Sequence, residues 1–144
     1  MRTLLVIATF IIGTPCAVTA QHLVAGSQME YTVAGIQTGA SVWWINNRQW
    51  AAGAFHQVAI WNTGEVNKGS SFSGLQLAVP VAKGEKIRFV GLVRGGLANE
   101  RFFIVVPGFE TQLAIGKRAG FACGMSFRMG YPALTSRVYI KLFH

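Results

Sequence analysis

Residues 120–131 alternate, position by position, between large apolar side chains and small or polar ones. The large apolar residues are Phe121, Cys123, Met125, Phe127, Met129 and Tyr131. Successive side chains of a β-strand point to opposite faces, so this segment predicts one strand whose apolar face is buried. Similar patterns recur along the chain, with no convincing helical periodicity. The sequence therefore predicts an all-β domain.

Gly, Asn, Ser and Pro residues divide the apolar segments into about nine expected strands. These strands cover residues 29–36, 41–46, 55–62, 75–81, 86–93, 101–106, 113–115, 120–131 and 138–142. The polar stretch 62–73 is expected to be a loop, and 94–99 another. Pro80 lacks a backbone N–H, which places its strand at the edge of a sheet.

The favoured architecture is a single antiparallel β-sandwich of jelly-roll or Greek-key type, with a small β-barrel as the alternative. Segments 41–46 and 101–106 are apolar on both faces, which suits central strands of two packed sheets. A transmembrane barrel would need an apolar row outside every strand and polar residues inside. Its lumen would then have to hold Lys86, Arg88, Arg137 and Lys141. We therefore expect these four basic residues outside the core.

The first twenty residues have the features of an export signal. Arg2 precedes a short apolar run at residues 4–12, and Ala20 ends a stretch of small residues. We expect a signal peptide at 1–20 and one domain at 21–144, in a protein that is secreted or held in the cell envelope. Cys123 is then the only cysteine of the mature chain. A buried, inert thiol is favoured, with an intermolecular disulfide as the alternative.

The charge balance points to a covered surface and anionic partners. Charged residues make up 12% of the chain, against about 25% in typical soluble domains. The net charge is +8, and all five acidic residues are glutamates. Copies of the same chain, a membrane or a ligand could cover such a surface. The positive excess favours lipid headgroups or acidic polysaccharide, and export argues against nucleic acid.

The sequence offers little equipment for catalysis. Without aspartate there is no Ser-His-Asp triad, and Glu85, Glu100 and Glu110 are expected to be solvated at strand ends. The three histidines (His22, His56 and His144) do not form a local metal-binding motif, nor do the cysteines. We expect no enzyme activity, no metal and no cofactor, and we rank an enzyme built from distant Glu and His residues third.

The tryptophans are the best candidates for recognition. All four lie between Trp43 and Trp61, and Trp43 and Trp44 must face opposite ways if 41–46 is a strand. The expected ligand-binding residues are Trp43, Asn47, Arg48 and Trp50, which resemble in kind the stacking and donor groups of sugar sites and of membrane interfaces. The alternative is that Trp44 and Trp61 are core residues and the others pack in loops.

A basic patch is expected where the strands that carry Lys86 with Arg88 and Arg137 with Lys141 are neighbours; otherwise they form two solvated faces. The leading hypothesis is a secreted, non-enzymatic, lectin-like binding module for a carbohydrate or an anionic membrane surface. The alternative is a structural subunit of an extracellular or envelope assembly such as a fibre, coat or secretion apparatus. That alternative rests on low charge and on a strand edge able to pair with another copy, so a homo-oligomer is possible.

Overall fold

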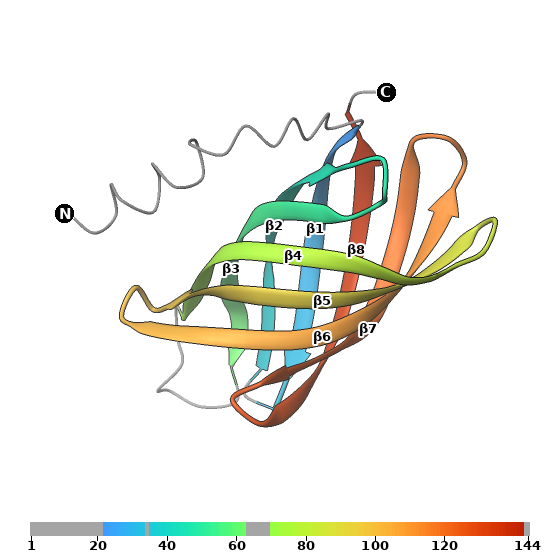
Figure 1. Ribbon diagram of the computed structural model, residues 1–144. Helices are drawn as coiled ribbons and strands as arrows, with labels where there is room; N and C mark the ends of the chain where they lie inside the picture. The colour runs from blue at the N-terminus through green and yellow to red at the C-terminus, as the bar shows by residue number, and fades with distance from the viewer. Residues whose placement is uncertain (1–21, 34, 63–69, 143–144) are drawn as a thin grey trace, which may run out of the picture.

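The computed structural model describes residues 22–33, 35–62 and 70–142, which form eight antiparallel strands (Figure 1). The strands are β1 (His22–Thr32), β2 (Gly35–Ile45), β3 (Ala51–Asn62), β4 (Ser71–Lys83), β5 (Ile87–Ala98), β6 (Phe102–Ile115), β7 (Ala119–Arg128) and β8 (Tyr131–Lys141). Within this part of the chain, no helix is long and apolar enough to cross a bilayer. The expected signal peptide at 1–20 lies outside the described residues.

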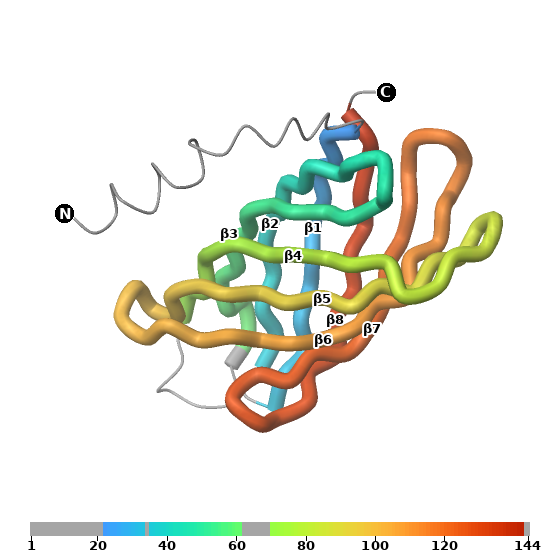
Figure 2. The backbone as a smooth tube through the Cα atoms, in the orientation of Figure 1, coloured from blue at the N-terminus to red at the C-terminus, as the bar shows by residue number. Residues whose placement is uncertain are grey.

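The eight strands close into one barrel in which each strand pairs with its neighbours in sequence (Figure 2). Closure comes from antiparallel pairing of β1 with β8, from Val24 opposite Lys141 to Tyr31 opposite Leu134. The start of β1 and the end of β8 therefore lie side by side. This topology confirms the all-β prediction and its small-barrel alternative, and the favoured sandwich is wrong. Segments that are apolar on both faces favoured a sandwich over a barrel in the sequence analysis. They are equally compatible with this barrel, because its lumen also holds apolar clusters.

The strands are fewer and longer than expected, because several predicted turns lie inside strands. Residues 39–40 belong to β2, residues 94–98 to β5, and Pro107 to β6. The turns expected near residues 46–48 and 84–85 are confirmed. Most of the expected loop 62–73 lies outside the described residues, and β4 begins at Ser71.

The strand that contains Pro80 is not an edge strand, because β4 pairs with both β3 and β5. The β3–β4 ladder ends at Ala78, however, so Pro80 has a partner only on β5. The β4–β5 register also shifts between Pro80 and Ala82. Such an irregularity is one of the few ways to accommodate a residue that cannot donate a ladder hydrogen bond.

The side chains of β7 alternate with the expected period of two residues, but the apolar face points outward and not into the core. Ala122 and Ser126 are buried inside the barrel, whereas Cys123 and Phe127 are exposed on its outer wall. The favoured buried thiol is therefore wrong, because the apolar face of the strand points outward. Arg88 likewise faces the lumen, and its neighbours Ile87 and Phe89 face outward. The sequence reading assigned these two faces the other way round.

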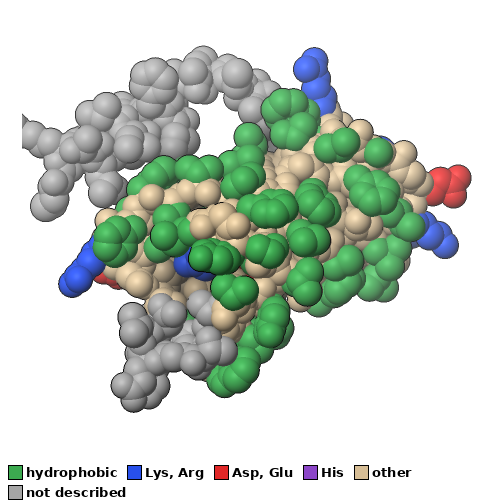
Figure 3. All heavy atoms as spheres, turned by 90° about the horizontal axis from the view of Figure 1, so that it is seen from below, with side chains coloured by type: hydrophobic (Ala, Val, Ile, Leu, Met, Phe, Trp, Pro, Cys, Tyr) green, Lys and Arg blue, Asp and Glu red, His purple; other side chains and the backbone are tan. Residues whose placement is uncertain are grey.

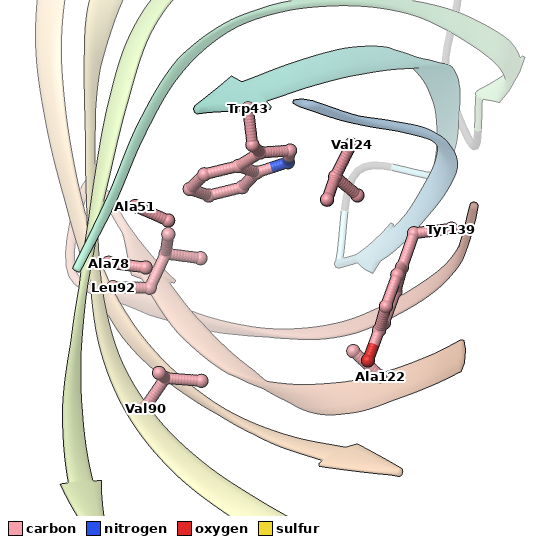
Figure 4. Packing of buried hydrophobic residues seen from close by; sticks show 8 residues of the cluster. All are labelled: Val24, Trp43, Ala51, Ala78, Val90, Leu92, Ala122 and Tyr139. Carbon is pink, nitrogen blue, oxygen red and sulfur yellow. The ribbon is translucent and has the colours of Figure 1, made fainter. Parts of the chain in front are cut away.

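Two apolar clusters fill much of the lumen. The larger contains Val24, Trp43, Ala51, Ala78, Val90, Leu92, Ala122 and Tyr139, whose side chains point inward from several strands (Figure 4). The smaller contains Phe55, Phe72 and Val106, with the Phe55 and Phe72 rings edge to face at 4.7 Å between centroids. Gly120 leaves room for the ring of Tyr139, which a Cβ at position 120 would overlap. An eight-stranded barrel is just wide enough to be filled by side chains in this way.

We predict that Gly96→Ala destabilises the barrel, because a Cβ at Gly96 would overlap the backbone carbonyl of Ser73 on the paired strand. Backbone cannot move aside cheaply, so the expected loss is about 1–3 kcal/mol of unfolding free energy. Equilibrium unfolding in urea measures it. Gly91→Ala is the matched control on the same strand, since its nearest neighbour, a Val81 methyl, is 3.8 Å away. Equal losses in the two variants would contradict this account.

Candidate functional site

A buried polar network crosses the lumen and joins four strands. Arg94 Nη1 donates to Glu30 Oε2 at 2.7 Å and to Gln57 Oε1 at 3.2 Å. Arg94 Nη2 donates to Ser126 Oγ at 3.0 Å, and that hydroxyl donates to Glu30 Oε1 at 3.4 Å. The side chains of Arg94 and Glu30 are 2% and 0% exposed. A charge this deeply enclosed is tolerated only when it is paired and hydrogen-bonded, and this network supplies both.

A second ion pair lies elsewhere in the lumen. Arg137 Nη2 donates to Glu110 Oε2 at 2.6 Å, and both side chains are buried. The Arg137 guanidinium also lies over the Trp43 ring, 4.4 Å from its centroid, and 5.8 Å from that of Tyr139. These are cation–π distances, so the rings share the stabilisation of the buried cation. The expectation that Glu110 is a solvated carboxylate is wrong, because its strand continues past Pro107 into the barrel.

Three of the four basic residues expected to form a patch meet inside the barrel. Arg88, Arg137 and Lys141 line one cavity, together with Gln49 and Gln112. We call this cavity the terminal mouth, because it opens at the end of the barrel where β1 begins and β8 ends. Arg88 Nη1 donates to Gln49 Oε1 there. Lys86 lies in the adjacent turn, exposed and outside the cavity lining.

The opposite mouth holds a larger cavity. Its cavity holds about 340 Å³ and is lined by Phe102, Ile104 and Tyr131 among others, with Arg128 in the wall. Arg128 Nη1 donates to Gln37 Oε1, and the guanidinium lies 4.9 Å from the Phe72 ring centroid. The cation is thus already engaged by an acceptor and a ring.

The four expected ligand-binding residues do not share one surface. Trp43 is 3% exposed and points into the lumen, where its Nε1 donates to Ser41 Oγ at 3.1 Å. Asn47, Arg48 and Trp50 lie in the exposed turn between β2 and β3. The Trp50 backbone N–H donates to Asn46 Oδ1 at 3.0 Å, which fixes the turn. Only these three residues are available to a ligand outside the barrel.

Trp44 and Trp61 are exposed on the outer wall, so the alternative reading that made them core residues is wrong. Trp43 and Trp44 do face opposite ways, as strand geometry requires. His56 is also on the outer wall, with Nδ1 2.6 Å from Ser73 Oγ. Within the described residues, no group of three or more His, Cys and Glu side chains converges as metal ligands would.

Sequence reasoning missed the central network, although its residues carry a signal. Glu30, Gln57, Arg94 and Ser126 each follow or precede a large apolar residue that lies on the opposite face of the strand. If the faces that hold these residues had been assigned to a lumen, all four would have been expected inside the barrel. Arg94 was instead assigned to a glycine-containing loop, and no local pattern connects it to Glu30, which is 64 residues away.

Comparison with known proteins supports the fold and nothing finer. No protein-family model matches the chain, and no curated protein matches it. A solved structure from work described as "De novo design of transmembrane beta-barrels" superposes with a TM-score of 0.71 at 7% identity, covering 85% of this chain and 96% of the other. The solution NMR structure of the de novo designed TMB2.3 superposes at 0.68 and 6% identity, covering 86% and 96%. The chain thus shares the architecture of designed barrels, as an all-β antiparallel fold.

We predict that Glu30→Leu costs about 3–5 kcal/mol of unfolding free energy, because it leaves the buried Arg94 cation without its counter-charge. The double variant Glu30→Leu/Arg94→Met should recover most of that loss, since no unpaired charge remains. Equilibrium unfolding in urea compares the parent chain with both variants. Glu85→Gln is the control, because Glu85 is exposed in a turn. A double variant no more stable than Glu30→Leu would contradict the assigned role of the pair.

Proposed function

We propose that this chain is an integral membrane protein, a β-barrel that crosses the bilayer of a cell envelope with a closed lumen. The observation that carries the proposal is the sorting of side chains between the two faces of the wall. Among the described residues, 29 large apolar side chains are exposed, most of them on the outer wall, and both ion pairs are buried inside the barrel. A barrel in water would place these groups the other way round.

Many of the side chains on the outer wall are large and apolar. In Figure 3, hydrophobic side chains spread across the visible face, and most charged side chains stand toward its ends. The strands contain 10 to 14 residues, and a tilted strand needs about 9–11 residues to cross the hydrocarbon core. Strands of this length with an apolar outer face match a membrane-spanning barrel.

Exposed aromatic residues gather at the two ends of the strands. Tyr31, Trp61 and Phe103 lie at one end; Trp44, Trp50 and Phe89 lie at the other. Aromatic girdles at both interfaces are typical of barrels in membranes, because these rings favour the headgroup level. One of the two designed structures that share the fold comes from work described as the design of transmembrane β-barrels, which supports this proposal.

Exposed basic residues around the terminal mouth support a preference for anionic lipid. These residues are Arg48, Lys83, Lys86, Lys117 and Arg118. Basic residues close to a bilayer surface are attracted to anionic headgroups by about 1 kcal/mol each. Arg48 and Trp50 thus keep a role in surface recognition, as interfacial anchors of a spanning barrel. The lectin-like function has no comparable support, because Trp43 is inside the lumen.

The direct test is refolding of the mature chain into zwitterionic vesicles loaded with a small fluorescent dye. We expect the protein to resist carbonate extraction and the strands to resist protease, since the bilayer covers them. We expect the vesicles to retain the dye, because apolar clusters and the Arg94 network fill the lumen. Full extraction by carbonate would contradict membrane insertion, and rapid dye release would contradict the closed lumen.

We predict that Val93→Arg destabilises the barrel in lipid by about 2–4 kcal/mol, the cost of a cation at the bilayer midplane. Val93 is 46% exposed on the outer wall, midway along β5. Ile115→Arg is the matched control: it is also exposed and apolar but ends β6, where the cost falls to about 0–1 kcal/mol. Urea unfolding in vesicles measures both. An equally small effect for the two variants would mean that water, not lipid, covers the wall.

A further inference from the structure

The lumen carries more positive than negative charge. Within the described strands, the inward-facing ionised side chains are Arg88, Arg94, Arg128, Arg137, Lys141, Glu30 and Glu110. Glu30 is paired with Arg94 and Glu110 with Arg137. The imbalance is concentrated at the terminal mouth, where Arg88, Arg137 and Lys141 face one carboxylate. Uncompensated like charges in a partly enclosed space repel each other and attract an anion.

The terminal mouth also has donors without acceptors. Arg137 is 5% exposed, and its Nε and Nη1 have no hydrogen-bond partner among the described residues. Arg88 donates to a neutral amide, that of Gln49, and Lys141 forms no ion pair with a described carboxylate. A buried donor left unpaired costs free energy, so a ligand that accepts from it is favoured.

We propose that the terminal mouth binds a small inorganic anion of the size of chloride, between Arg88, Arg137 and Lys141. The free space among the lining side chains is about 20 Å³ for the centre of a water-sized sphere, enough for roughly one or two water molecules. A monatomic halide fits such a space, whereas phosphate or an organic carboxylate would have to displace the lining. The anion neutralises part of the local excess charge and accepts from the guanidinium and ammonium groups.

The site contains its own reporter, because the Arg137 guanidinium stacks on the Trp43 ring. Bromide quenches tryptophan fluorescence on contact. We would therefore prepare the chain with Trp44→Phe, Trp50→Phe and Trp61→Phe, fold it in a zwitterionic detergent, and titrate bromide at constant ionic strength against sulfate. Bound bromide should quench Trp43 in a saturable way, and chloride should reverse it by competition. The assay needs no bilayer, so its result is independent of the proposed membrane insertion.

Substitutions separate this site from general surface charge. In the single-tryptophan background, Arg88→Gln and Lys141→Gln should each raise the half-saturating bromide concentration at least about tenfold, a ratio equivalent to 1.4 kcal/mol. Lys86→Gln removes the same charge from the same end of the barrel, but outside the cavity, and should change it less than about twofold. Far-UV circular dichroism checks that each variant is folded, and the two cavity variants test the site independently.

Three results would overturn the proposal. Quenching that rises linearly with bromide in the parent protein would mean collisions without a site. Equal shifts in Lys86→Gln and the cavity variants would mean attraction to the surface as a whole. Unchanged affinity in both folded cavity variants would mean that bromide reaches Trp43 by another route.

Discussion

The pairing of β1 with β8 is the constraint on which the rest of this structure depends. It converts an open sheet into a ring, so the strands satisfy their backbone N–H and C=O groups within the wall. Once the backbone no longer needs water, the outer surface of the wall can be apolar without a penalty from unpaired ladder groups. The same closure encloses a small lumen, and that lumen is where the polar side chains can find one another. The separation of apolar side chains on the outer wall from polar side chains in the lumen therefore follows from closure of the barrel.

The period of the pattern could be predicted from the sequence, and its direction could not. In β7, the alternation of Phe121, Ala122 and Cys123 specifies a two-faced strand equally well whichever face is turned inward. The prediction assigned the apolar face to a core, whereas in the structure that face forms the outer wall. For the same reason, Arg88 was predicted to face outward, although its side chain lines the lumen. The low charge content was the available signal, since charged residues make up 12% of this chain and about 25% of typical soluble domains.

The candidate sites depend on pairings that local sequence does not contain. Arg94 meets Glu30 across 64 residues, and Arg137 meets Glu110 across 27. Both encounters require the barrel to close with one register, because the partners come from strands that are not neighbours in the wall. The grouping of Arg88 with Arg137 was anticipated only as a patch on adjacent strands. Closure brings them together across the lumen instead, and leaves Lys86 outside.

The buried ions specify this register more than they contribute to stability. Because strand side chains alternate with a period of two, a slip of one residue would turn an entire face of β1 outward. Apolar side chains alone would resist such a slip weakly in a lipid surrounding, since the lumen also accepts Val24 and the outer wall accepts Met29. Glu30 would be moved to the outer wall, and Arg94 would lose its counter-charge in the lumen. A charge in hydrocarbon and a charge unpaired in a dry lumen are both costly. The ion pairs thus exclude the wrong registers, and they do so most strongly when lipid covers the wall.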